Sequence, residues 1–207
     1  MHEKEMSIAD AYDRMPHDPN NLFVKAAYKS FCRQTVRQWN MMHAEGVSAF
    51  PWRRAGQPYN CSADLFAHLH VDSRFYFFTG GTLPADHPLV VKSGIRRNGV
   101  DLTYNDIFRA VHDYFGHYLI RASFGPKGEE AAYQNHLTYY TGLARLALQT
   151  ETQGQSSWFN YGKHLRQLRY TDSGWIEDMP TPNEQLYVKP SERPYAKQKA
   201  NLIALYL

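Results

Sequence analysis

The spacing of apolar residues along the chain predicts a mainly helical protein. Between residues 20 and 45, apolar side chains recur every three or four positions, as they do on the buried face of an amphipathic helix. Thr103 followed by Asp106 predicts a capping box, which marks the start of another helix. The further helices that this spacing predicts cover residues 62–71, 103–119, 129–152 and 196–207. We therefore expect a compact helical domain.

A small, irregular β segment is expected near residues 75–100. The four consecutive aromatic residues at 75–78 are typical of a strand. Three apolar residues at 89–91, followed by an Asn-Gly pair at 98–99, predict a small hairpin. Residues 50–61 contain two prolines and a glycine and are expected to form a loop.

The N-terminal residues have a different character from the rest of the chain. Residues 1–19 are polar and include Pro16 and Pro19, so we expect a loosely tied arm with one short helix. Residues 20–207 then form a single, mainly helical, metal-binding domain, which is a usual size for one domain.

Composition and charge narrow the classes of partner. The chain has 207 residues, of which 43% are hydrophobic and 21% charged, as in ordinary globular proteins. Its net charge is +3, and basic residues form only short clusters such as Arg53-Arg54 and Arg96-Arg97. The sequence therefore permits binding to nucleic acid but does not indicate it. The oligomeric state is left open.

The location of the protein follows from what the sequence lacks. No stretch approaches the roughly 18 apolar residues that suggest a membrane span, so no membrane partner is expected. The N-terminus has no apolar signal-peptide core, and Cys32 and Cys61 are not part of a CxxC pair. We expect a cytoplasmic protein with reduced thiols.

Two histidines in one short segment are the strongest sign of chemistry. His112 and His117 are five residues apart, with Asp113 after the first and Gly116 before the second. On a straight helix, five residues rotate by roughly 140°, which would separate the two rings. Either the helix is distorted or begins near His112, with Gly116 allowing close approach, or Asp113 and His117 form the converging pair. Both pairs offer ligands suited to iron, manganese or zinc.

A carboxylate is needed to complete such a site. Glu151 lies between two threonines and precedes glutamines, which predicts a hydrogen-bonded interior carboxylate and makes it our first choice. The alternatives are Glu129 and His136, which are seven residues apart and share a helix face. On an unbroken helix His136 would lie roughly 22 Å from Glu151, so both cannot bind one ion. Two histidines and one carboxylate form the facial triad of non-heme iron(II) oxygenases.

Four neighbouring residues are candidates for supporting roles in catalysis. We expect Asp113 and His136 to orient ligands or move protons, since ligand histidines usually have a second polar partner. Arg109, one helical turn before His112, and Tyr114 are expected to face the substrate.

The segment VHDYFGH, residues 111–117, resembles the iron-binding signature of the pterin-dependent aromatic amino-acid hydroxylases. In that family two histidines and a later glutamate bind iron. The resemblance implies that His112, His117 and Glu151 are ligands of Fe(II). This chain has Tyr118-Leu119 where that family usually has a proline, which weighs against a pterin cofactor.

A second resemblance covers residues 103–161. The runs NDIFRAVHDYFGH, GEEAAYQNHLTYY, ARLALQTETQGQ and SWFNYG resemble an uncharacterised domain that recurs in bacteriophage and mobile-element proteins. This resemblance implies a phage or prophage origin, and hence a location in the host cytoplasm. It implies no particular activity.

Three hypotheses about function follow. The first is a mononuclear Fe(II) enzyme that uses O2 to oxidise a small molecule or a nucleobase, with Mn or Zn as alternative metals. The second is a phosphohydrolase acting on nucleotides, because His112-Asp113 resembles the core of the HD-type enzymes. The third is a non-enzymatic phage accessory or virion protein with a buried polar network.

Overall fold

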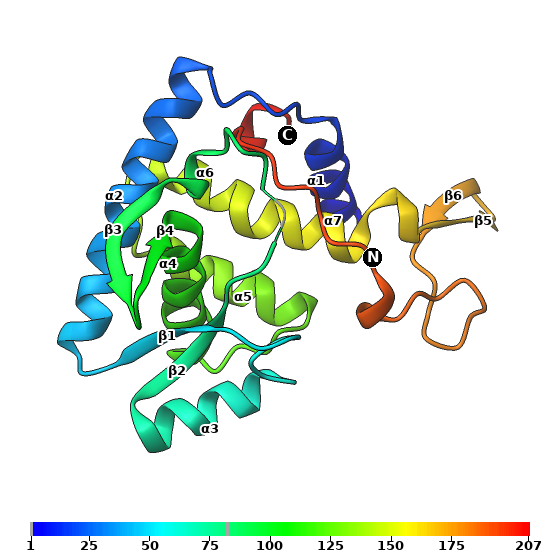
Figure 1. Ribbon diagram of the computed structural model, residues 1–207. Helices are drawn as coiled ribbons and strands as arrows, with labels where there is room; N and C mark the ends of the chain where they lie inside the picture. The colour runs from blue at the N-terminus through cyan, green and yellow to red at the C-terminus, as the bar shows by residue number, and fades with distance from the viewer. Residues whose placement is uncertain (1, 82) are drawn as a thin grey trace.

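The computed structural model confirms a compact, mainly helical architecture (Figure 1). It describes residues 2–81 and 83–207, so Met1 of the expected arm and Thr82 lie outside the described part. In this part of the chain, no helix combines the length and the apolar character needed to cross a bilayer. The α-helices are α1 (Glu3–Arg14), α2 (Leu22–Ala44), α3 (Ser62–Asp72), α4 (Tyr104–Val111), α5 (Pro126–Leu137), α6 (Ala144–Gln149) and α7 (Gln155–Tyr161).

Helices α2 and α4 begin where the sequence predicts. The side chain of Asn21 caps α2 by accepting hydrogen bonds from the backbone of Phe23 and Val24. At the start of α4, Thr103 Oγ1 accepts from the Asp106 backbone at 3.2 Å and Asp106 Oδ2 accepts from the Thr103 backbone at 2.8 Å. These bonds satisfy amides that a helix start leaves without an intrahelical partner, and they confirm the capping box.

The two helices predicted last along the chain are not continuous. Instead of one helix over residues 129–152, α5 ends at Leu137 and a turn with Gly142 at φ +57° leads into α6. A π-helical segment, Thr150–Gly154, then joins α6 to α7. In the range 196–207 only Ile203–Leu205 form a short 3-10 turn. Apolar spacing does not reveal a reversal at a single left-handed glycine, and this explains the longer prediction.

The β structure consists of three separate two-stranded sheets. The predicted strand at 75–78 is β2 (Arg74–Phe78), and the predicted hairpin is β3 (Lys92–Arg97) with β4 (Val100–Thr103). The expected loop at 50–61 is wrong at its start, because β1 (Ser48–Trp52) pairs in parallel with β2. The hairpin of β5 (Gln167–Thr171) and β6 (Gly174–Asp178) has no counterpart in the prediction.

The expected N-terminal arm is a packed helix. Its apolar side chains Ile8, Ala11 and Tyr12 are buried, together with Met15, against Ile203 near the C-terminus. Figure 1 shows α1 beside α7 and the C-terminal segment. The spacing of these four residues is three and four, so the helical signal was present within a polar composition.

The main core lies between α2, α4 and α6 and is rich in aromatic side chains. Phe31 of α2 contacts Phe108 of α4 and stacks on Tyr140, with ring centroids 5.0 Å apart in both pairs. Aromatic rings bury large apolar areas and hold fixed geometries. This core gives α4 and the segment after it a rigid support, and α5 packs across that segment.

Candidate metal centre

The backbone changes from an α-helix to a π-helix at the first of the two histidines. Residues His112–Tyr118 form a π-helical segment that continues α4. A π-helix repeats its hydrogen bonds at five residues, so a five-residue step returns close to the same face. The rings of His112 and His117 are 5.0 Å apart and perpendicular. Of the two arrangements left open by the sequence, this is the distorted helix with converging imidazoles.

Glu129, in the first turn of α5, brings a carboxylate to the two rings. Its oxygens lie 3.9 Å from His112 Nε2 and 3.5 Å from His117 Nε2. One donor atom from each of the three residues lies within 4.8 Å of the other two. Ligands at about 2.0–2.2 Å from one ion would be separated by at most about 4 Å, so small side-chain movements suffice. The three residues fit a single metal ion.

His117 Nε2, the ring nitrogen that is not bonded to the backbone, faces Glu129. His117 Nδ1 lies 3.1 Å from the carbonyl oxygen of Ala122, to which it can only donate. The proton of the neutral ring is therefore on Nδ1, and the lone pair is on Nε2. This arrangement matches that of ligand histidines, which donate their second nitrogen to a carbonyl or carboxylate.

A chain of three side chains sets the tautomer of His112. The amide nitrogen of Gln38 donates to the Tyr139 carbonyl, which leaves its Oε1 to accept from His136 Nε2 at 2.7 Å. His136 Nδ1 is then an acceptor, and it receives the Nδ1 proton of His112 at 3.0 Å. His112 Nε2 is consequently a lone pair directed toward Glu129. The Nδ1 hydrogen bonds thus leave the Nε2 atoms of both histidines facing Glu129.

The charges of the cluster favour an ionised Glu129 beside the two imidazoles. Burial alone would raise the pKa of Glu129, but His112 and His117 outweigh it and hold that pKa at about 2. Burial lowers the pKa of His117, but the facing carboxylate outweighs it and the pKa is raised. Burial, helped by the charges of His112 and His117, keeps the pKa of His136 well below its usual range. His136 therefore stays neutral in its relay.

Gly116 makes room for the ring of His112. A Cβ at this position would lie 3.1 Å from His112 Cε1 and Nδ1 and 3.4 Å from the Cβ of Ala132 on α5. The imidazole therefore lies against bare backbone, between the π-helical segment and α5. The predicted role of this glycine, close approach of a histidine, agrees with its contacts.

Glu151 lies in a different buried network. Its carboxylate accepts from Tyr28 Oη at 2.5 Å and from Gln155 Nε2 at 2.7 Å, and His87 Nε2 is 3.4 Å away without hydrogen-bond alignment. Burial and then Glu151 raise the pKa of Tyr28 well above its usual value, so this phenol remains a donor. The predicted interior carboxylate is real, but Glu129 is the acid that stands beside the two histidines.

Asp113 and Tyr114 follow His112 directly but have separate surroundings. Asp113 is outside the three-residue cluster, and burial raises its pKa to about 7. Tyr114 is buried, and its hydroxyl donates to Glu45 Oε2 at 2.7 Å. The hydroxyl of Tyr114 is therefore committed to a contact at the end of α2.

Arg109 is one turn before His112 and partly buried. Its guanidinium lies over the ring of Phe78, 5.3 Å from the centroid. Its Nε is buried and has no hydrogen-bond partner within residues 2–81 and 83–207. Burial lowers the pKa of this group, although Asp113 and Asp106 act in the opposite direction. A buried guanidinium that lacks a hydrogen-bond partner is stabilised when an anionic group binds to it.

The sequence predicts Glu129 only as an alternative to Glu151, and it does not indicate Gln38 at all. Glu129 was an alternative ligand, and its seven-residue spacing from His136 was the signal that placed both on the face packed against the π-helical segment. Gln38 comes from a distant helix, and no local pattern marks it.

Comparison with protein-family models, with curated proteins and with solved structures gives no match for this chain. The chemistry of the three-residue cluster is therefore the basis for assigning a function.

Proposed function

We propose that the protein is a metal-dependent enzyme whose ion is held by His112, His117 and Glu129. The observation that carries this proposal is the convergence of two imidazole lone pairs and one carboxylate within 4.8 Å. Each histidine has its other nitrogen fixed by a hydrogen bond, which is the arrangement that holds metal ligands in place. The side chains of His112 and Glu129 remain 13% and 25% exposed.

We propose Fe(II) as the metal and O2-dependent oxidation of a small molecule or nucleobase as the reaction. Two histidines and one carboxylate leave coordination positions open, and in non-heme iron enzymes these positions activate O2 next to the substrate. Mn or Zn are the alternatives for this donor set. His136 holds the His112 ring in orientation, and Arg109 supplies a positive charge for an anionic substrate group. Asp113, with its raised pKa, can hold a proton nearby.

The other two hypotheses have less support. An HD-type phosphohydrolase uses the aspartate of its His-Asp pair as a ligand, and Asp113 is outside the cluster. A purely structural network would pair a protonated His117 with Glu129, whose facing atoms are 3.5 Å apart. Bound metal is the measurement that separates this arrangement from the proposed site. Phage origin and a cytoplasmic location remain parts of the proposal, and the free thiols of Cys32 and Cys61 are compatible with a reducing compartment.

Metal content of the purified protein tests the site. We expect about one equivalent of bound transition metal after anaerobic reconstitution with Fe(II), measured by plasma mass spectrometry. Glu129→Ala and His117→Ala should each reduce the bound metal by more than about tenfold, because each removes a direct ligand. Glu151→Gln should retain it, because Glu151 lies in the Tyr28 network.

The matched control is Glu130→Gln, the next residue on α5, whose carboxylate contacts Gln134 and Gln153. It removes the same charge without touching the cluster and should leave metal content unchanged. Equal metal content in wild type, Glu129→Ala and Glu130→Gln would exclude the site. If the wild type binds metal as expected, oxygen consumption by the metal-loaded protein will separate an oxygenase from a hydrolase.

A further inference from the structure

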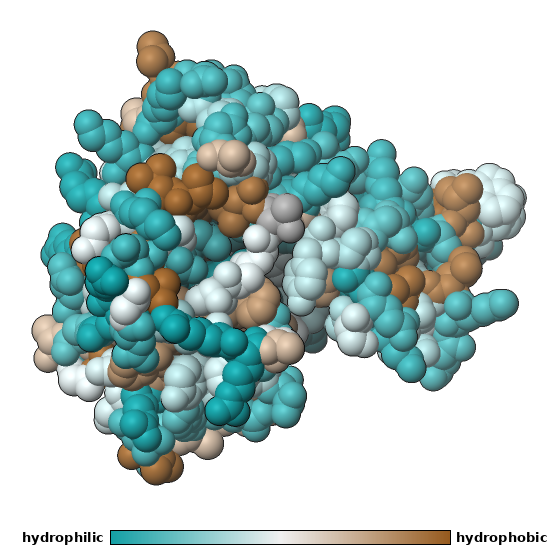
Figure 2. All heavy atoms as spheres, in the orientation of Figure 1, coloured by the Kyte–Doolittle hydropathy of each residue, from teal (hydrophilic) through white to brown (hydrophobic). Residues whose placement is uncertain are grey.

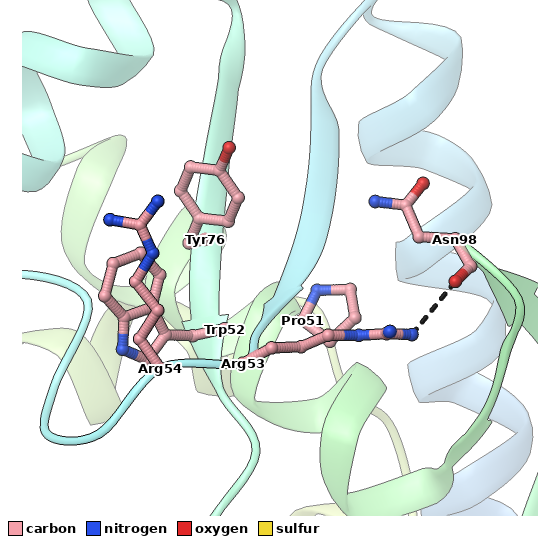
Figure 3. Close-up of a pocket in the computed structure, with 6 residues that line it drawn as sticks. All are labelled: Pro51, Trp52, Arg53, Arg54, Tyr76 and Asn98. Atoms are coloured by element: carbon pink, nitrogen blue, oxygen red, sulfur yellow. Dashed lines mark hydrogen bonds between the residues drawn. The ribbon is translucent and has the colours of Figure 1, made fainter.

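A pocket lies on the surface, at the end of the parallel pair β1–β2 (Figure 3). Its volume is about 360 Å³. The residues that line it are Pro51, Trp52, Arg53, Arg54, Tyr76 and Asn98. The lining thus combines two guanidinium groups with two large aromatic rings and contains no acidic side chain.

The strand register brings the aromatic rings to one face. Residues 50 and 52 of β1 and residues 76 and 78 of β2 all point away from the core, because side chains alternate along a strand. All four of these residues are aromatic. The rings of Trp52 and Tyr76 are 5.5 Å apart at 65°, and His68 of α3 packs against Tyr76 at 5.7 Å. This outward face is a supported aromatic surface.

The two arginines are held differently. Arg53 donates through Nη2 to the backbone oxygen of Asn98 at 2.9 Å, which fixes one edge of its guanidinium at the pocket rim. Arg54 lies over the indole of Trp52, with Cζ 5.5 Å from the ring centroid, and its side chain is exposed. Trp52 Nε1 is buried and has no partner in the described part of the chain. Movement of Arg54 would therefore uncover one face of the indole ring.

We infer that this pocket binds one nucleotide unit, either free or within a single strand of nucleic acid. The base would stack on Trp52 or Tyr76, because aromatic rings accept the flat face of any base. Arg53 and Arg54 would contact the phosphate, since a guanidinium matches the geometry of phosphate oxygens. The pocket is distinct from the metal centre, and its occupancy does not depend on a metal.

The sequence did not indicate this pocket because its parts are far apart in the chain. Arg53-Arg54 and Arg96-Arg97 are separate short clusters in the sequence. The contact between Arg53 and Asn98 joins the β1 end to the turn after Arg97. Arg97 lies over Trp39 and Arg96 beside Asp101, so Arg53 and Arg54 are the basic side chains that line the pocket.

Fluorescence anisotropy of a short, labelled oligothymidylate with the full chain tests the inference. We expect Arg53→Gln/Arg54→Gln to weaken binding at least about tenfold, because both phosphate contacts are lost. The plot of log affinity against log salt should have a slope of about −0.7 for the one phosphate that the two arginines neutralise, and it should flatten in this variant. Tyr76→Leu should weaken binding by roughly 5–150-fold if a base stacks there.

The control variant Arg33→Gln/Arg37→Gln removes the same charge from the exposed side of α2. It should change the affinity by less than about twofold. Equal weakening by the two double variants would mean diffuse charge attraction and would overturn the inference, as would an absence of binding by the wild type.

Competition distinguishes the two sources of the ligand. Displacement of the oligonucleotide by a free nucleoside monophosphate supports a single-unit pocket. Binding of the oligonucleotide alone supports a site within a strand-binding track. Inorganic phosphate that competes as well as the nucleotide would show that the base is not recognised and would contradict the inference. Melting temperatures of all variants verify that they are folded.

Discussion

Hydrogen bonds at single atoms decide which nitrogen of each histidine is available in the proposed metal centre. A neutral imidazole has one donor and one acceptor nitrogen, and the partner of one fixes the role of the other. In this protein an amide side chain on α2, Gln38, determines the state of a ring on the π-helical segment through His136. Gln38 is therefore a positioning residue although it touches no ligand atom of the proposed site.

Replacement of Gln38 by leucine tests this positioning role. The change leaves the buried His136 Nε2–H without an acceptor, which should cost about 1–3 kcal/mol of stability. It also frees His136 to change tautomer, so metal affinity should fall roughly 10–100-fold. Metal affinity by competition with a chelator, and stability by urea unfolding, are the two measurements.

Gln34→Leu is the matched control for this prediction. Gln34 lies one turn earlier on α2 and bonds to the backbone of Thr141, away from His136. This variant should lose stability but keep its metal affinity. A similar loss of affinity in both variants would mean that α2 acts only by supporting the fold.

At this scale the sequence predicted the parts of the site that are local. The five-residue spacing and the glycine between His112 and His117 left two arrangements open, and the structure has the one in which the two imidazoles converge. Glu129 and Gln38 reach the same point from other elements, so their place depends on how α5 and α2 pack, and no spacing along one segment encodes it.

Among the elements, the π-helical segment has the largest effect on the geometry of the proposed metal centre. Residues five apart lie on different faces of an α-helix, which has 3.6 residues per turn, but they lie close to the same face in this π-helical segment. A second π-helical segment at Thr150–Gly154 turns Glu151 into the interior. Such segments frequently occur at functional sites, since they redirect side chains that an α-helix would separate.

Gly116→Ala tests the packing of this segment. The new methyl group would lie 3.1 Å from the His112 ring, and the π-helical segment or α5 would have to move. We expect a loss of about 1–3 kcal/mol in unfolding free energy, as for overpacked interiors. Metal affinity should also decrease, because His112 can no longer keep its orientation.

Gly125→Ala provides the comparison for this change. Gly125 has a negative φ, and its nearest neighbour to an added Cβ, Ser123 Oγ, is 3.8 Å away. Its metal affinity should equal that of the wild type. An unchanged affinity and stability in Gly116→Ala would show that the glycine is not required for the ring to approach.

Element boundaries were predicted well where a chemical signal marks them. The Thr103–Asp106 capping box begins α4, and the Asn98-Gly99 turn closes its hairpin with both residues at positive φ. Predictions failed where tertiary contacts determine the course of the backbone. The chain reverses near Gly142, and β1 forms only because β2 lies next to it.

For the whole molecule, the two ends of the chain share a small core separate from the main one. Ile203 packs between Ile8, Tyr12 and Met15, and its backbone donates to Thr150 Oγ1 at 2.9 Å. Asn201 bonds to the carbonyl of Pro16. The C-terminal segment thus ties α1 to the helices that carry Glu151.

Ile203→Ala should destabilise the protein by about 2–5 kcal/mol, because it leaves a cavity in this small core. The metal centre lies in other elements, so metal content of the folded protein should be unchanged. Ile176→Ala, at a position 42% exposed, should change the unfolding free energy by less than about 0.5 kcal/mol. Equal effects of the two substitutions in urea unfolding would contradict a structural role for the second core.

The β5–β6 hairpin projects from the body of the molecule, where hydrophobic atoms are visible at the right of Figure 2. Leu168, Tyr170 and Trp175 are each at least 69% exposed. The outer edge of each strand also has backbone groups with no neighbouring strand in the described fold. Concentrated solutions will bring such ribbons together edge to edge. Crowding, rather than heat, is therefore the condition in which we expect this protein first to associate with itself.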